Sequence, residues 1–237
     1  MRNKLIGLAL AMAAALMLAT GMVSTAPVAM AATTAAQVIT VSAPSSTSTY
    51  ATVEAWARQA DGRYRRVAVF RQARIGSQGM GPTSESLSRT PTGQYTLSQP
   101  FGMQPNPGTT SPYIHIDRND VWTGSSSTVI NEHRRCAPGT CPASYATAER
   151  LSNYPDSYRY GFFIGYNANP PYGTGAAAGR GSAFFFHVRN TQATAGCVAV
   201  SSAEMIWLIR WLKFQNSPIV SIGVGSAAYA PIPNRYV

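Results

Sequence analysis

A histidine and a cysteine ten positions apart are the residues of this chain best suited to chemistry. His187 ends the apolar run 183–186, and Cys197 follows the polar loop after it. An imidazole close to a thiol can take its proton and leave a thiolate, the nucleophile of cysteine catalysis. Gly196 lets the backbone turn tightly and present N–H groups to a developing oxyanion. The pattern therefore predicts a cysteine nucleophile with a histidine base.

The same two residues also fit a purely structural interpretation. A lone cysteine after a glycine is commonly a small buried hydrophobic residue, and a lone histidine at a strand end is commonly a satisfied polar group. Cys/His patterns transfer poorly between families, because spacing in the sequence does not bring the two groups together. Spacing alone leaves both interpretations open.

Three elements must hold this pair in place. The run before His187 reads as a strand, and a second short apolar run begins at Cys197. A helix should follow, with Ser201 or Ser202 as its N-cap. Its apolar residues recur at helical spacing, and they are Met205, Trp207, Leu208, Trp211 and Leu212. The local prediction is strand, loop, short strand and helix, with the imidazole and the thiol at the two ends of the loop.

Two motifs resemble those of the L,D-transpeptidase (YkuD-type) catalytic domain family. The family signature is a histidine, a variable loop and then Ser/Thr-His-Gly-Cys, which corresponds here to His187, Thr194, Gly196 and Cys197. Upstream, the segment 89–97 (RTPTGQYTL) is similar to the Thr-Pro-x-Gly motif that leads into a strand of that family. The two motifs stand in the family's order, and the resemblance extends over residues 64–223.

The resemblance implies a fold and a reaction. The fold would be mostly β, an L,D-transpeptidase-like β-sandwich with the site in a groove and one helix after the cysteine. Cys197 would form a thioester with a peptidoglycan tetrapeptide stem, and His187 would transfer the proton. Backbone groups of Thr194, Gly196 and Cys197 would hold the oxyanion. Transfer to the amine of a neighbouring stem would give a 3→3 cross-link, and no metal or organic cofactor is expected. Water as acceptor would instead give an L,D-carboxypeptidase.

The chain departs from the family pattern at three points. Ala195 stands where the family usually has histidine, Ala199 stands where arginine or asparagine is common, and the loop before the cysteine is short. These departures question the choice of acceptor and the rate more than the nucleophile. Arg180, Arg189 and Tyr166 are the predicted substrate-binding residues, with the arginines placed to bind stem carboxylates. Such arginines are also often simply solvated.

Two other functional classes compete with this hypothesis. In the first, the chain is a non-catalytic module that binds peptidoglycan, and Cys197 is inert. In the second, it is an exported cysteine hydrolase that acts on another peptide.

The three cysteines suggest one disulfide and one free thiol. Cys136 and Cys141 are five positions apart across Ala-Pro-Gly-Thr, which is turn chemistry. A disulfide there contributes roughly 2 kcal/mol in the chain-entropy model and leaves Cys197 free. A metal cluster of His133 with these two cysteines is the alternative, but it lacks a clear fourth ligand. We expect no metal site.

The first 31 residues have the outline of a secretory signal. Arg2 and Lys4 precede the apolar run 5–18, and Ala-Met-Ala at 29–31 fits a cleavage site. An uncleaved membrane anchor is the alternative. With cleavage the mature chain would be secreted or associated with the cell wall, with no membrane anchor.

The charge of the chain favours anionic surroundings. The formal net charge is +10, and loss of two basic residues with the signal leaves +8. This excess suits anionic cell-wall polymers. The sequence has no basic helix and no nucleic-acid-binding motif, so nucleic acid is not an expected partner.

Short strands and frequent turn residues indicate a mostly-β sandwich or barrel. Residues 32–49 are rich in Ala, Thr and Ser and predict a flexible leader, although residues 37–42 could pair as a first strand. The catalytic domain is expected over residues 50–237. The Pro/Gly-rich segment 167–181 is expected to form a lid or a wall of the site, because long loops in compact domains usually serve function.

Overall fold

The structure is a computed structural model that describes residues 33–125, 128–145 and 147–237. The predicted secretory signal, residues 1–31, lies outside the described residues. Within the described ranges, no helix is both long enough and apolar enough to cross a bilayer.

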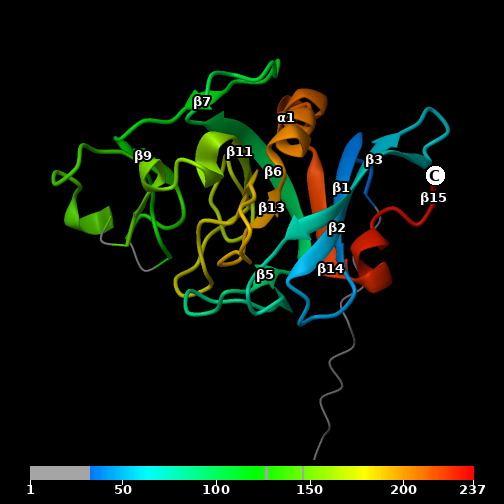
Figure 1. Cartoon of the computed structure of the whole chain (residues 1–237), viewed down its shortest axis with the longest axis horizontal. Coiled ribbons are helices and arrows are strands. Elements are labelled where there is room, and N and C mark those ends of the chain that lie inside the picture. Colours follow the sequence, from blue (N-terminus) through cyan, green and yellow to red (C-terminus); the bar gives the residue numbers. More distant parts are fainter. Residues whose placement is uncertain (1–32, 126–127, 146) are drawn as a thin grey trace, which may run out of the picture.

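One large sheet forms the body of the molecule (Figure 1). Its main strands are β1 (Gln37–Ala43), β2 (Tyr50–Arg58), β3 (Tyr64–Arg74), β6 (Gly93–Gly102), β11 (Gly161–Ile164), β12 (Phe185–Val188), β13 (Val198–Val200) and β14 (Ile219–Val224). They follow the order β11-β12-β13-β3-β2-β1-β14-β6, and β6 pairs again with β11. The sheet thus closes on itself. Two shorter strands pair in parallel with strands of this sheet: β7 (Ile114–His115) with β6, and β15 (Arg235–Tyr236) with β3.

The prediction of a mostly-β fold with a helix after the cysteine is confirmed. The strand pairing differs from that of a sandwich of two separate sheets. Strand β11 is hydrogen-bonded to both β12 and β6, so it joins the two ends of one sheet. Closure leaves fewer unpaired strand edges than two separate sheets would have. The alternative of a barrel describes the pairing better.

Strand β1 corrects the predicted start of the domain. It lies between β2, with which it runs antiparallel, and β14, with which it runs parallel. Val38, Ile39 and Val41 are fully buried on it. Residues 32–49 are therefore not a flexible leader throughout, because residues 37–43 form an interior strand. The alternative of a first strand over residues 37–42 is confirmed, with one further residue at its end.

The single α-helix of the described chain, α1 (Ser202–Trp211), follows β13 directly. Ser201 is its N-cap: the hydroxyl accepts the Glu204 N–H at 3.3 Å, and the Glu204 carboxylate accepts the Ser201 N–H at 2.7 Å. This capping box is worth about 1 kcal/mol. Met205, Leu208 and Ile209 face the main apolar core. The helix therefore holds the end of the strand that begins next to Cys197.

An insert segment, residues 103–160, projects from the closed sheet between β6 and β11 (Figure 1). It contains a small sheet in the order β10-β8-β9, made by β8 (Asp120–Trp122), β9 (His133–Arg135) and β10 (Glu149–Arg150). It also carries three short 3-10 helices, η1 (Ala143–Tyr145), η2 (Leu151–Asn153) and η3 (Ser157–Arg159). The remaining elements of the chain are β4 (Met80–Gly81), β5 (Thr90–Pro91), η4 (Phe214–Asn216) and η5 (Gly225–Tyr229).

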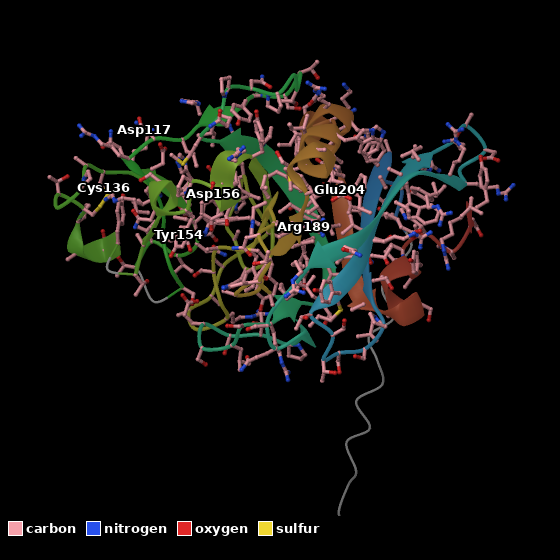
Figure 2. The ribbon with its side chains drawn as sticks, in the orientation of Figure 1. Asp117, Cys136, Tyr154, Asp156, Arg189 and Glu204 are labelled. Atoms are coloured by element: carbon pink, nitrogen blue, oxygen red, sulfur yellow. A yellow bond between two sulfur atoms is a disulfide. The ribbon has the colours of Figure 1, made fainter. Side chains whose placement is uncertain are left out.

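The predicted disulfide lies in the insert segment. Cys136 and Cys141 are bonded, with their Cα atoms 5.2 Å apart. Figure 2 places Cys136 at the end of the insert far from the closed sheet. The described partner of His133 is a carboxylate, because its Nε2 lies 2.8 Å from an oxygen of the fully buried Asp120.

An aromatic cluster fixes the insert segment to the sheet. Trp122 stacks on Phe163 with ring centroids 4.4 Å apart and meets Phe185 edge-on at 5.1 Å. Phe101 stacks on the same Phe163 at 4.6 Å. Each such pair adds about 0.5–1.5 kcal/mol beyond the burial of its area. Cys197 belongs to this cluster, so the position of the insert and the surroundings of the thiol are linked.

The interior place of β1 can be tested by truncation. A chain that begins at Thr33 should fold, whereas a chain that begins at Tyr50 should not. Each apolar side chain buried on β1 contributes about 1.5–3 kcal/mol, and their sum approaches the whole stability of a typical domain. Circular dichroism and thermal unfolding measure the difference. Cooperative unfolding of the shorter chain at the same temperature would contradict the assignment.

Candidate active site

The parallel pairing of β12 with β13 brings the predicted histidine and cysteine to one face of the sheet. His187 lies opposite Ala199 in this pairing, and Cys197 precedes Ala199 by two residues. Because strand side chains alternate between faces, the thiol and the imidazole are diagonal neighbours whose Cα positions lie about 8 Å apart. All three residues line one cavity of about 270 Å³.

The sulfur of Cys197 lies between two backbone groups. The Phe185 N–H donates to Sγ at 3.4 Å, and the thiol donates to the Ala183 carbonyl at 3.3 Å. Only 8% of the residue is exposed. Burial raises the pKa of the thiol to about 12, the Glu149 carboxylate adds to the rise, and the Phe185 N–H opposes it. The Cys197 side chain therefore rests as a neutral thiol.

His187 is held as a neutral base. Its Nδ1 lies 2.9 Å from the Val188 carbonyl. A carbonyl can only accept, so Nδ1 carries the proton and Nε2 keeps a free lone pair. Burial lowers the pKa of the imidazole, while the bond to Val188 opposes the fall. The ring is thus neutral at neutral pH and able to take a proton at Nε2.

The loop before Cys197 is held by two threonine hydroxyls. Thr194 Oγ1 donates to the Cys197 carbonyl at 2.7 Å and accepts the Gly196 N–H at 3.1 Å. The fully buried Thr90 also donates to the Cys197 carbonyl, at 3.4 Å, and accepts the Gly76 N–H. The Gly196 N–H, predicted to serve the oxyanion, is thus engaged by Thr194. Thr90 of the Thr-Pro-x-Gly motif thus supports the cysteine directly.

Gly196 has to be glycine for two reasons. Its φ is +141°, which side-chain-bearing residues rarely adopt. A Cβ here would lie 2.6 Å from the Phe184 ring and 2.9 Å from the Arg89 carbonyl. The tight turn at Gly196 lets the loop pack closely against these two groups, and it places the thiol of Cys197 in the cavity.

The opposite wall of the cavity comes from the insert segment. Glu149, Tyr154 and Tyr158 line it. The Tyr158 hydroxyl donates to the Glu149 carboxyl, and its ring meets the His187 ring edge-on, with centroids 5.7 Å apart. Burial raises the pKa of Glu149. No motif marked these residues; the one available signal was the scarcity of acids, with only 9 Asp and Glu in the chain.

The segment 167–181 contributes less to the cavity than expected. It does not supply the described lining, which on this side begins at Ser182. Ala168 is fully buried, and Tyr172 meets Trp122 edge-on at 5.1 Å. The loop therefore packs against the aromatic cluster, and the wall is provided by residues 149–158 instead.

The three predicted substrate-binding residues lie outside the described lining of the cavity. The Arg189 guanidinium donates to the Gln72 carbonyl at 2.7 Å. Tyr166 packs edge-on against Phe184, and its hydroxyl donates to the Arg180 carbonyl at 2.9 Å. Through these contacts Arg189 and Tyr166 stabilise the fold. A role of all three residues in substrate binding stays a prediction.

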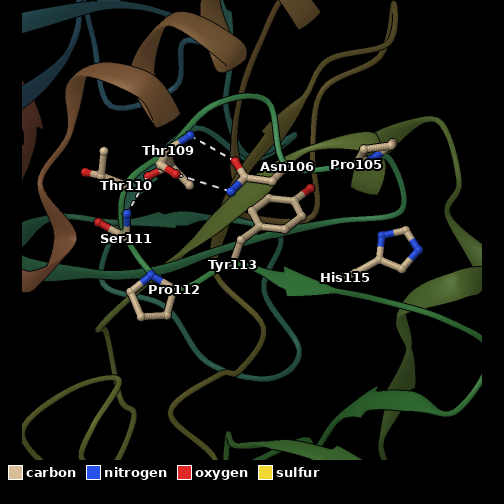
Figure 3. Close-up of a pocket in the computed structure, with 8 residues that line it drawn as sticks. All are labelled: Pro105, Asn106, Thr109, Thr110, Ser111, Pro112, Tyr113 and His115. Atoms are coloured by element: carbon tan, nitrogen blue, oxygen red, sulfur yellow. Dashed lines mark hydrogen bonds between the residues drawn. The ribbon is translucent and has the colours of Figure 1, made fainter.

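A larger hollow, about 790 Å³, lies along residues 105–115 (Figure 3). Its Asn106 is used within the loop: the side-chain oxygen accepts the N–H groups of Gly108 and Thr109, both at 2.9 Å. His115 is exposed on its rim. The hollow contains no cysteine among the described residues, so the smaller cavity is the candidate active site.

Comparison with known proteins places the chain in a family. Residues 37–226 match the family model YkuD, the L,D-transpeptidase catalytic domain. The match covers most of the chain, so the chain belongs to this family, as the two sequence motifs predicted. Members of the family are cysteine-dependent L,D-transpeptidases or related enzymes. No curated protein sequence matches the chain significantly.

The need for glycine at position 196 predicts a large effect of Gly196→Ala. The added methyl should lower the free energy of unfolding by about 2–6 kcal/mol, because contact overlap adds to backbone strain. Gly175→Ala is the matched control, since φ there is +152° and no atom lies within 4 Å of its Cβ position. That variant should lose only about 1–3 kcal/mol. Equal losses in denaturant unfolding would refute the steric explanation.

Proposed function

We propose that this chain is an exported L,D-transpeptidase that forms 3→3 cross-links between peptidoglycan stem peptides. The observation that carries the proposal is the shared cavity of Cys197 and His187, with the imidazole held neutral at Nε2. Family membership supports the reaction class in general. The 3→3 linkage and the identity of the stem peptides are part of our proposal and go beyond family membership.

The reaction has two balanced steps. In the first, Cys197 Sγ attacks the carbonyl before the terminal D-Ala of a tetrapeptide stem while His187 Nε2 takes the thiol proton. The carbon–sulfur bond forms, the amide bond breaks, and the proton leaves with the amine of D-Ala. In the second, the acceptor amine attacks the thioester and gives its proton to His187. A new amide bond forms, the carbon–sulfur bond breaks, and His187 returns the proton to the sulfur.

The oxyanion of each step needs N–H donors near the sulfur. With the Gly196 N–H engaged by Thr194 in the resting state, we assign the backbone N–H of Cys197 to this role. Gly196 would join it only if its bond to Thr194 opened. No step requires a metal or an organic cofactor.

Glu149 favours an amine acceptor over water. It is the only carboxyl group in the described lining of the cavity. Its pKa is raised by burial, so an entering ammonium group would favour its ionised form and gain a charge-assisted hydrogen bond. The carboxylate would then take the extra proton of the ammonium, which leaves the free amine to attack. Water carries no positive charge, so it gains no ion-pair attraction to the carboxylate. This is the specific reason to prefer cross-linking over L,D-carboxypeptidase trimming.

Export and an anionic setting complete the proposal. The charged start, apolar run and small-residue end of residues 1–31 motivate export. The disulfide of Cys136 and Cys141 is typical of oxidising compartments. The net charge of +8 that remains without Arg2 and Lys4 suits retention among anionic cell-wall polymers. We therefore propose a secreted or wall-associated location.

Acylation by a carbapenem tests the nucleophile. Intact mass of the protein after incubation should show one adduct on the wild type and none on Cys197→Ala. His187→Ala should acylate about 10²–10⁴-fold more slowly, because the base is missing. An unmodified wild type with Cys197 reduced would refute the proposed function and favour a binding module.

The role of Glu149 predicts a change in product ratio. With a tetrapeptide stem as donor and a second stem as acceptor, Glu149→Gln should lower the ratio of cross-linked dimer to hydrolysed tripeptide by about tenfold, the value of one charge-assisted hydrogen bond. Chromatography of the products measures this ratio. A variant with the wild-type ratio would remove Glu149 from acceptor binding.

A further inference from the structure

Asn131 is a buried residue whose side chain is fully used. It is 1% exposed and lies in the insert segment. Its Oδ1 accepts the Trp122 indole N–H and the Ala183 N–H, the latter at 3.0 Å. Its Nδ2 donates to the carbonyls of Tyr166 and Asn167 at 3.1 and 2.7 Å. This one amide therefore ties the insert segment to the chain that leads into β12.

Ala183 has an unusual backbone for a residue with a side chain. Its φ is +57°, in the left-handed region, which costs roughly 1–2 kcal/mol for a non-glycine residue. Such a conformation persists only where neighbouring contacts enforce it. The described hydrogen bond of its N–H goes to Asn131. Its carbonyl, turned the other way, accepts the thiol of Cys197 at 3.3 Å.

Asn131, Ala183 and Cys197 thus form a continuous chain of contacts from the insert segment to the nucleophile. We infer that Asn131 is a positioning residue, which holds Ala183 in its left-handed conformation and thereby aims the Cys197 sulfur into the cavity. This inference rests on the proposed role of Cys197. It assigns to the insert segment a part in preparing the nucleophile, in addition to its part as a wall.

The titration of Cys197 reports this arrangement. The thiol faces His187 on β12, Glu149 on β10, and Tyr154 and Tyr158 around η3. The hydrogen bond from the thiol to the Ala183 carbonyl favours the neutral thiol. If this bond is lost while the four groups stay in place, the pKa of the thiol should fall. The pH midpoint of Cys197 alkylation by iodoacetamide should then fall by about half a unit to one unit.

The experiment compares Asn131→Ala with the double variant Asn131→Ala/Ala183→Gly. In the single variant Ala183 should relax to negative φ, so the alkylation midpoint falls and carbapenem acylation slows about tenfold to a hundredfold. In the double variant glycine adopts positive φ without strain. Both readouts should therefore return most of the way to wild type. A merely structural role of Asn131 predicts no rescue by glycine at this position.

Asn167→Ala is the matched control. Asn167 is also a buried asparagine at positive φ, and its side chain bonds the backbone of Ala177 and Gly181 rather than Ala183. Its loss should lower the melting temperature, and Ala183→Gly should not reverse any change in alkylation or acylation.

Should Asn131→Ala fail to fold, Ala183→Val tests the same contact from the other side. A β-branched residue is strongly disfavoured at positive φ, so acylation should fall and the midpoint should shift as above. Wild-type behaviour of Asn131→Ala or of Ala183→Val, or loss without rescue by glycine, would overturn the inference. These results differ from failure of the proposed function, in which the wild type itself does not acylate.

Discussion

The parallel hydrogen bonding of β12 to β13 is the constraint on which the site depends. It sets His187 against Ala199 and leaves Cys197 two residues earlier on the same face. A shift of this register by one residue would turn the cysteine to the opposite face of the sheet. The register of β12 against β13 is held by the neighbouring strands of the closed sheet and by α1, which follows β13. The chemistry therefore depends on strand pairing before it depends on any side-chain contact.

The proposed nucleophile, Cys197, lies where its charged form is disfavoured. Cys197 belongs to the aromatic cluster that joins the insert segment to the sheet, and burial raises its pKa to about 12. Such a site protects the thiol from side reactions, because the thiolate is the reactive form. It also makes the neutral His187 necessary, since the proton has to leave as the sulfur attacks. The same burial that suppresses the thiolate keeps the imidazole unprotonated.

The insert segment gives the site its particular character. Its aromatic residues dock on β11 and β12, and this docking carries Glu149 and Tyr158 to the cavity and Asn131 to Ala183. None of these contacts is local in the sequence. We infer that the common catalytic pair sits on the closed sheet, while acceptor preference and the resting state of the thiol depend on the insert.

The sequence by itself determined the nucleophile candidate, its histidine, the family, the helix and its cap, and the disulfide, because each rests on residues close together in the chain or on a family motif. Only the tertiary structure decided the interior place of β1, the closure of the sheet, and the contacts of Thr90, Asn131 and Glu149 around Cys197. The physical reason is the distance along the chain over which each kind of interaction acts. Turn, cap and motif signals act over a few residues, whereas pairing partners and buried hydrogen bonds join segments that only the folded chain brings together.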